Sequence, residues 1–237
     1  MPEDRIRRQL FGYCTFAGAA VLATFVIGLT EITPFQRFFG RLPPLTTVAA
    51  LVVLGGGAFF WLVKNGWVAR RPLPGARLWL HIAALAAFFA LPTILVDTVA
   101  PFASDINVAP PAGVLYYLAI AQVVEVLFHL LPLAAFLWIG SRLIPATATP
   151  KVTFWTVAIA LALLEPGFQL LADPQVDIPV WRHSYLVLHL FAFNLLQLAL
   201  LRHYGFVAAI TFRLSYYLVW HILWGTLRLE MAFLPPA

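Results

Sequence analysis

The sequence predicts an all-α integral membrane protein, a polytopic bundle of transmembrane helices. Hydrophobic residues make up 62% of the 237 residues and charged residues 11%, whereas soluble domains average about 45–50% and about 25%. Because these few polar residues cannot cover a water-facing surface, lipid must be the main solvent. The apolar runs show little alternation of period two, which excludes a transmembrane β-barrel.

Seven apolar runs are long enough to cross a bilayer as helices, for which about 20 residues are needed. They cover residues 10–30, 45–63, 78–99, 113–140, 152–172, 184–201 and 204–227. Prolines and charged residues fill the gaps, and no gap is long enough for a soluble domain. The last gap is so short that the final two runs also fit a tight hairpin, and six or eight spans remain alternatives. We expect one transmembrane domain over residues 1–237.

The distribution of Lys and Arg predicts a cytoplasmic N-terminus, because cytoplasmic loops carry an excess of these residues. One set of alternate gaps holds Arg5, Arg7, Arg8, Lys64, Arg70, Arg71, Arg77, Arg142, Lys151 and Arg202. The other set holds only Arg37, Arg41, Arg182 and Arg228. The first apolar run exceeds a signal-peptide core of about 7–15 residues, so we expect a retained span. The bias towards Arg, Ala and Leu is typical of a GC-rich bacterial genome. We therefore expect a multi-pass protein of the bacterial inner membrane.

Charge and cysteine content argue against nucleic-acid binding, an intrachain disulfide and a cysteine-based metal cluster. The net charge of +5 comes from residues between apolar runs, and no basic run interleaves with aromatics as a nucleic-acid groove requires. The lipid bilayer is the expected partner, and nucleic acid is not. The single cysteine, Cys14, excludes an intrachain disulfide and a cysteine-based metal cluster. We expect Cys14 to be a small buried hydrophobe.

Glu125 and His129 are the candidate site residues of the fourth run. Ionisable groups in mid-membrane are costly and usually mark function. Their separation of four residues places both on one helical face. Such a pair can share a proton, orient a water or supply two metal ligands, or it can be a buried ion pair that positions the helix. Both interpretations remain open. Pro132 should disturb the helix near Phe128.

Glu165 and Arg213 are the other two candidate site residues. Glu165 precedes Pro166, so we expect the fifth run to break there and restart at Pro166, with Glu165 as a cap or as part of a site. Arg213 lies deep in the last run and stays charged. We expect it to pair with Glu125, Glu165 or both.

The remaining ionisable residues of the apolar runs have structural interpretations. His81 and Asp97 lie near the two ends of the third run, and we expect both at the membrane rim. His189 and His221 lie within the last two runs, and we expect helix-interface histidines with satisfied hydrogen bonds.

Three stretches follow one another on successive predicted helices: residues 124–129 (Val-Glu-Val-Leu-Phe-His), residues 161–165 (Leu-Ala-Leu-Leu-Glu), and residues 204–210 (Tyr-Gly-Phe-Val-Ala-Ala-Ile) ahead of Arg213 and Tyr217. In this order they resemble the Glu-Glu-x-x-x-Arg, Phe-x-x-x-His and His-x-x-x-Asn motifs of the CPBP family. These are the intramembrane CAAX proteases and bacteriocin-processing enzymes, also called Abi proteins. The resemblance covers residues 113–226.

This resemblance implies a CPBP-like core and an intramembrane metalloendopeptidase, with zinc as its metal if it is active. Glu125 stands at the second Glu and would be the general base, with His129 as its partner. Val124 replaces the first Glu, and Glu165 and Arg213 replace the two histidines. Arg213 would then stabilise an oxyanion or a carboxylate.

Three functions fit these residues. We favour a divergent, non-catalytic member that binds a membrane-embedded peptide or protein. The alternative is an active protease with a relocated Glu/His site, in which His129 and His189 or His221 supply the imidazoles. A small transporter or proton relay ranks third, because the sequence shows no inverted repeat.

Overall fold

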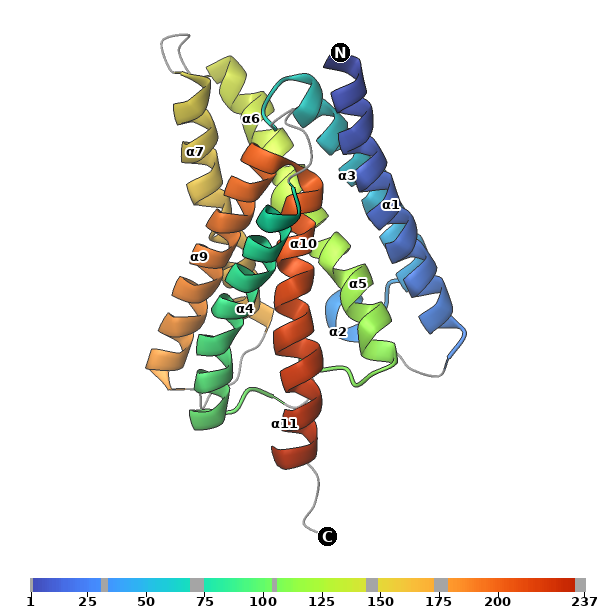
Figure 1. Ribbon diagram of the computed structural model, residues 1–237, viewed down its shortest axis with the longest axis vertical. Coiled ribbons are helices and arrows are strands. Elements are labelled where there is room, and N and C mark those ends of the chain that lie inside the picture. Colours follow the sequence, from blue (N-terminus) through green and yellow to red (C-terminus); the bar gives the residue numbers. More distant parts are fainter. Residues whose placement is uncertain are drawn as a thin grey trace. The chain divides into compact units, whose positions relative to one another are not determined.

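The computed structural model describes residues 2–30, 34–68, 75–103, 106–143, 149–172 and 179–232. These residues form helices joined by turns and contain no strand, which confirms the all-α prediction (Figure 1). In chain order the helices are α1 (Pro2–Gly28), α2 (Gln36–Phe39), α3 (Pro44–Lys64), α4 (Ala76–Val99), α5 (Ala112–Val124), the π-helix η2 (Glu125–Leu130), α6 (Leu131–Leu143), α7 (Pro150–Leu161), α8 (Leu164–Ala172), α9 (Val180–Tyr204), α10 (Phe206–Tyr217), the π-helix η3 (Leu218–Trp224) and α11 (Gly225–Ala232).

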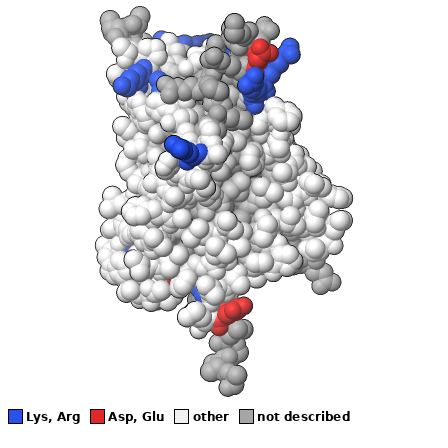
Figure 2. Space-filling model, in the orientation of Figure 1, with Lys and Arg blue, Asp and Glu red and all other residues white. Residues whose placement is uncertain are grey.

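All seven predicted runs coincide with helical segments that are long and apolar enough to cross a membrane. These segments are Ile6–Gly28, Pro44–Lys64, Ala76–Val99, Ala112–Arg142, Pro150–Leu171, Val180–Tyr204 and Phe206–Met231. Large apolar side chains such as Leu80 and Leu171 are exposed, and most of the surface in Figure 2 is uncharged. The chain is a multi-pass integral membrane protein whose solvent is a lipid bilayer.

The predicted orientation stays a prediction. Arg70 and Arg71, which contribute to it, lie outside the described residues, as do the side chains of Arg5 and Arg37. Cys14 is exposed on α1, so the expectation of a buried thiol was wrong. The outward face of a transmembrane helix contacts lipid, and a small apolar side chain is as well solvated there as in a core.

The chain forms two compact units. The first comprises residues 1–13, 53–73 and 124–209, and the second comprises residues 14–52, 74–123 and 210–237. The boundaries after residues 13, 52, 123 and 209 fall within helical segments. The expectation of a single membrane domain stays a prediction.

An aromatic cluster holds the first unit together where three helices meet. The Tyr13 ring of α1 lies 5.6 Å from the Phe59 ring of α3 and 4.9 Å from the Phe206 ring of α10. Gly55 allows this approach, because a Cβ atom there would lie 2.4 Å from Cγ2 of Val126 and 2.6 Å from the hydroxyl of Tyr13. Small residues serve in this way in many membrane helix interfaces.

Gly205 alone links α9 to α10. Its φ of 92° and ψ of −174° lie in a region that essentially only glycine adopts. Its N–H covers the carbonyls of Leu200 and Leu201, at 3.2 and 3.0 Å. A Cβ atom at this position would also lie 2.1 Å from Oε1 of Gln9. The chain can therefore reverse in a single residue only because that residue is glycine.

Gly205→Ala is expected to destabilise the protein by about 1–3 kcal/mol, because alanine is strained at this φ and ψ. It also displaces Gln9, whose Nε2 donates to the Tyr204 carbonyl at 3.3 Å. Thermal unfolding in detergent measures the change. The matched control is Gly57→Ala, since Gly57 is helical, exposed and has no neighbour within 4 Å of an added Cβ. Equal melting temperatures for the two variants would contradict the prediction.

Candidate functional site

The fourth span widens into a π-helical turn at the candidate site. Pro132 has no N–H to donate to the carbonyl of Phe128. The N–H of Leu131 instead donates to the carbonyl of Val126, five residues earlier. The disturbance predicted from Pro132 thus takes the form of the π-helix η2, a feature often found at functional sites. Glu125 and His129 both lie in this turn.

Glu125 and His129 form the predicted pair on one helical face. Nδ1 of His129 lies 3.0 Å from Oε2 of Glu125, and both residues are fully buried. Gln197 of α9 completes the cluster, because its Nε2 donates to the same oxygen of Glu125. The carboxylate is therefore contacted by an imidazole from its own helix and by an amide from a second helix of the same unit. We call Glu125, His129 and Gln197 the buried cluster.

Asn194 of α9 donates a hydrogen bond to a second carbonyl that a proline leaves without its helical donor. Ala162 lies four residues before Pro166, which has no N–H for the Ala162 carbonyl. Nδ2 of Asn194 donates to that carbonyl at 3.4 Å, and Asn194 is fully buried. Figure 1 shows α9 running beside α7 in this unit. Asn194 and Gln197 thus donate hydrogen bonds from one face of α9 to the two helical segments that prolines disturb.

Sequence reasoning missed these two amides because it considered only ionisable side chains. The available signal was the run Phe-Asn-Leu-Leu-Gln-Leu at residues 193–198, where two amides three residues apart interrupt an apolar helix. Such amides usually bridge helices in membranes.

Glu165 lies in the first turn of α8 and is 5% exposed. The predicted break is present, but it falls at residues 162 and 163 rather than at Pro166. The expected position was wrong because proline fits the first turn of a helix, where its missing N–H has no role. Glu165 lies near the N-terminus of α8, where the helix dipole stabilises a carboxylate.

Arg213 of α10 lies in the second unit and is 1% exposed. Its Nη1 donates to the hydroxyl of Tyr217 at 3.2 Å. Glu125 and Glu165 belong to the first unit, and their predicted pairing with Arg213 stays a prediction.

A second buried polar network lies in the second unit and centres on Asp97. Its Oδ2 accepts from Nε of Arg228 at 2.7 Å and from Nε1 of Trp224 at 2.8 Å, and its Oδ1 accepts from the N–H of Phe102 at 2.8 Å. Asp97 is 4% exposed and Arg228 2% exposed. Asp97 is buried because α11 returns to the end of α4 and supplies a counter-ion. Its expected position at the membrane rim stays a prediction. His81 is exposed, and its expected position at the rim stays a prediction.

Arg228 extends this network to the segment that follows α4. Its Nη1 donates to Oδ1 of Asn107 at 2.9 Å, and Nδ2 of Asn107 lies 3.4 Å from Nδ1 of His221. The His221 ring stacks on Tyr117 of α5, with centroids 4.4 Å apart. His221 is thus the satisfied interface histidine that we expected. His189 also packs on an aromatic ring, that of Tyr185.

The buried cluster does not fit the zinc that the family resemblance implies. Glu125 and His129 supply two ligands, whereas catalytic zinc takes three protein ligands and a water. Across the part of the chain that the structure describes, no three His, Cys, Asp or Glu side chains come together in a group that could hold a metal ion.

Comparison with known proteins gave no match to a protein-family model, a curated protein or a solved structure. The fold and the buried cluster define the class of this protein, a multi-pass membrane protein with seven membrane-length helices among the described residues and a buried polar cluster.

Gln197→Leu is expected to destabilise the protein by about 1.5–3 kcal/mol, because it removes a buried hydrogen bond to a charged group. Gln122→Leu is the matched control. Gln122 is 1% exposed, and neither its Oε1 nor its Nε2 has a hydrogen-bond partner, so leucine there should be neutral or stabilising. Chemical denaturation in detergent micelles compares the two. Equal losses would show that Gln197 contributes packing and no hydrogen bond.

Proposed function

We propose that the chain is a divergent, non-catalytic member of the CPBP-like membrane proteins and binds a membrane-embedded peptide or protein. The observation that carries this proposal is the buried cluster, in which the carboxylate of Glu125 is hydrogen-bonded by Gln197 and contacted by His129. The order of the motif-like stretches along residues 113–226 supports the family ancestry.

Hydrolysis requires a base that reaches water and a group that polarises the substrate carbonyl. Glu125 is fully buried, and its Oε2 accepts a hydrogen bond from Gln197 and is contacted by His129. Val124 offers no carboxylate at the position of the family's first Glu. Arg213 carries a fixed positive charge at a position where the family has a metal-compatible histidine. These substitutions favour a polar centre that stabilises helix packing.

A lipid-facing groove in the second unit supports the binding of a membrane segment. The groove has a volume of about 480 Å³ and is entirely apolar. Its lining comes from α1 and α3, namely Ala17, Gly18, Val21, Leu22, Phe25, Leu45 and Val52. Gly18 is exposed and has no neighbour within 4 Å of an added Cβ, so its backbone is open to a partner helix. Close approach at small residues drives helix association in lipid.

Purified protein is expected to contain far less than one zinc per chain, in the wild type and in His129→Ala alike, because two ligands hold zinc too weakly to retain it. Metal analysis by inductively coupled plasma mass spectrometry measures this. The same preparations should not cleave a membrane-tethered peptide. Near-stoichiometric zinc that His129→Ala removes, or cleavage that Glu125→Gln abolishes, would overturn the non-catalytic assignment and establish a protease.

Cys14 permits a direct test of the groove. It is the single cysteine, it is exposed, and it lies one turn before Ala17 and Gly18 on α1. A photo-crosslinker attached to Cys14 in native membranes is expected to trap a discrete adduct of higher mass.

Gly18→Leu should abolish that adduct by filling the groove. The matched control is Gly28→Leu, which changes another exposed glycine of α1 that does not line the groove. An adduct that survives Gly18→Leu, or no discrete adduct in the wild type, would contradict partner binding at the groove.

A further inference from the structure

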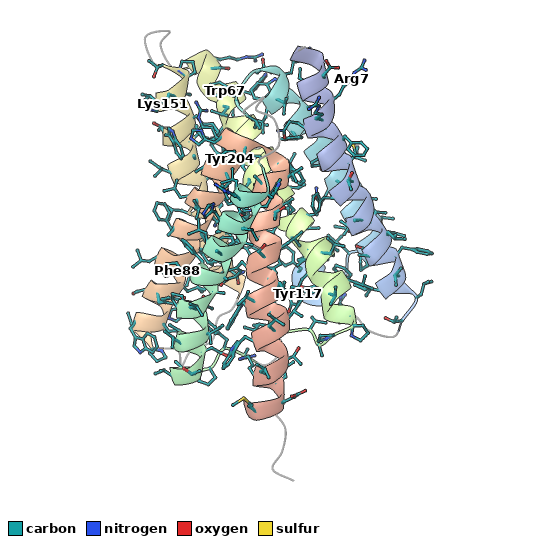
Figure 3. The ribbon with its side chains drawn as sticks, in the orientation of Figure 1. Arg7, Trp67, Phe88, Tyr117, Lys151 and Tyr204 are labelled. Carbon is teal, nitrogen blue, oxygen red and sulfur yellow. The ribbon has the colours of Figure 1, made fainter. Side chains whose placement is uncertain are left out.

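Four helix ends of the first unit meet at one place. Nε2 of Gln9, near the start of α1, donates to the carbonyl of Tyr204 at the end of α9. Nη1 of Arg202 donates to the carbonyl of Trp67, which follows α3, at 3.5 Å. The ring of His203 lies 6.4 Å from that of Trp155 in the second turn of α7. Arg7, Trp67, Lys151 and Tyr204 lie near this end of the unit in Figure 3. We call it the basic end.

Arg202 is held in place but keeps most of its donors. Its guanidinium lies over the ring of Phe154, 4.2 Å from the centroid, and Phe154 is fully buried. Among the described residues its one acceptor is the Trp67 carbonyl, and no carboxylate pairs with it. A guanidinium carries five N–H groups. A half-buried arginine that is fixed on an aromatic face and lacks a counter-ion is preorganised for an anion.

The surroundings of Arg202 are positively charged. Arg7, Arg8, Lys64 and Lys151 are exposed on the same unit, and Lys151 lies one turn before Phe154. Figure 2 shows basic side chains gathered near the start of α1. Glu125 and Glu165, by contrast, are buried. Asp4 is exposed near Arg7 and Arg8 on α1, and the exposed basic residues of this end outnumber it.

Cations near helix C-termini can simply complement the helix dipole, and α9 ends here. Arg202 lies in the last turn of α9 and fills this role, which uses its charge but not its N–H groups. The N–H of Gly205 covers the Leu200 and Leu201 carbonyls of α9, and Arg202 donates to a residue beyond α3. Among the described residues, the guanidinium thus donates to another segment and not to a carbonyl of its own helix.

We propose that the basic end binds the phosphate headgroup of an anionic membrane lipid, with Arg202 as the central ligand and Lys151 beside it. Four membrane-spanning segments begin or end here, so the site lies at the level of lipid headgroups. Trp67, Trp155 and Tyr204 are the aromatic types enriched at this level. Basic pockets between transmembrane helices bind acidic headgroups, and a phosphodiester accepts two parallel N–H bonds from arginine.

Fluorescently labelled phosphatidylglycerol, titrated into the full-length protein in detergent micelles, tests the proposal. The protein should bind it more tightly than labelled phosphatidylcholine. Arg202→Gln and Lys151→Gln should each weaken binding by roughly fivefold, which is the contribution of one basic residue at a membrane surface. Lys151 is exposed, so its variant keeps the test valid if Arg202→Gln fails to fold. Arg41→Gln, an exposed arginine of the second unit, is the matched control.

Three results would overturn the proposal. The two lipids could bind equally well, which would show that the headgroup charge is not recognised. Arg41→Gln could weaken binding as much as Arg202→Gln, which would show a diffuse charge effect. Inorganic phosphate could displace the labelled lipid at equal concentration, which would assign the site to the free anion. The outcome is independent of the partner-binding groove, which lies in the second unit.

Discussion

The constraint on which the rest of the structure depends is that lipid satisfies no hydrogen bond. In water a proline inside a helix leaves a carbonyl that solvent can cover, but in a bilayer the protein itself must cover it. Pro132 and Pro166 each create this demand in the first unit. A π-turn accompanies the first, and the amide of Asn194 covers the carbonyl left by the second. The position of α9 beside α7 and α8 follows, because only a neighbouring helix can bring an amide to the break.

The same constraint explains why the buried cluster is compact. A carboxylate in mid-membrane must be neutralised or hydrogen-bonded. Glu125 takes its contacts from His129 in its own π-turn and from Gln197 three residues after Asn194. One face of α9 therefore covers both a broken backbone and a buried acid. A fully buried carboxylate that two side chains hold stabilises helix packing, and it is poorly placed to activate water.

The fold was predictable from the sequence to the extent that hydropathy determines it. Each apolar run became a membrane-length helix, because nothing else can satisfy the backbone in lipid. The spacing of Glu125 and His129 also sufficed to predict their contact. Contacts between distant segments were not predictable in this way. Gln197 and Asn194 carry no charge, so a search for ionisable residues does not find them. Nothing in the sequence near Asp97 indicates that Arg228 of α11 lies 2.7 Å from it.

Two of the charged sites differ in where their counter-ion comes from. Asp97 and Arg228 are buried together, and each removes the electrostatic cost of the other. Arg202 has an aromatic face and a carbonyl but no carboxylate among the described residues. An arginine that is half-buried at a helix end without a counter-ion is stable in a membrane protein when the counter-ion comes from outside the chain. At the membrane surface that ion is abundant, since anionic phospholipids carry a phosphate. Charges buried in the interior must find a partner within the protein. At the membrane surface, by contrast, the lipid headgroup itself can serve as the partner of Arg202.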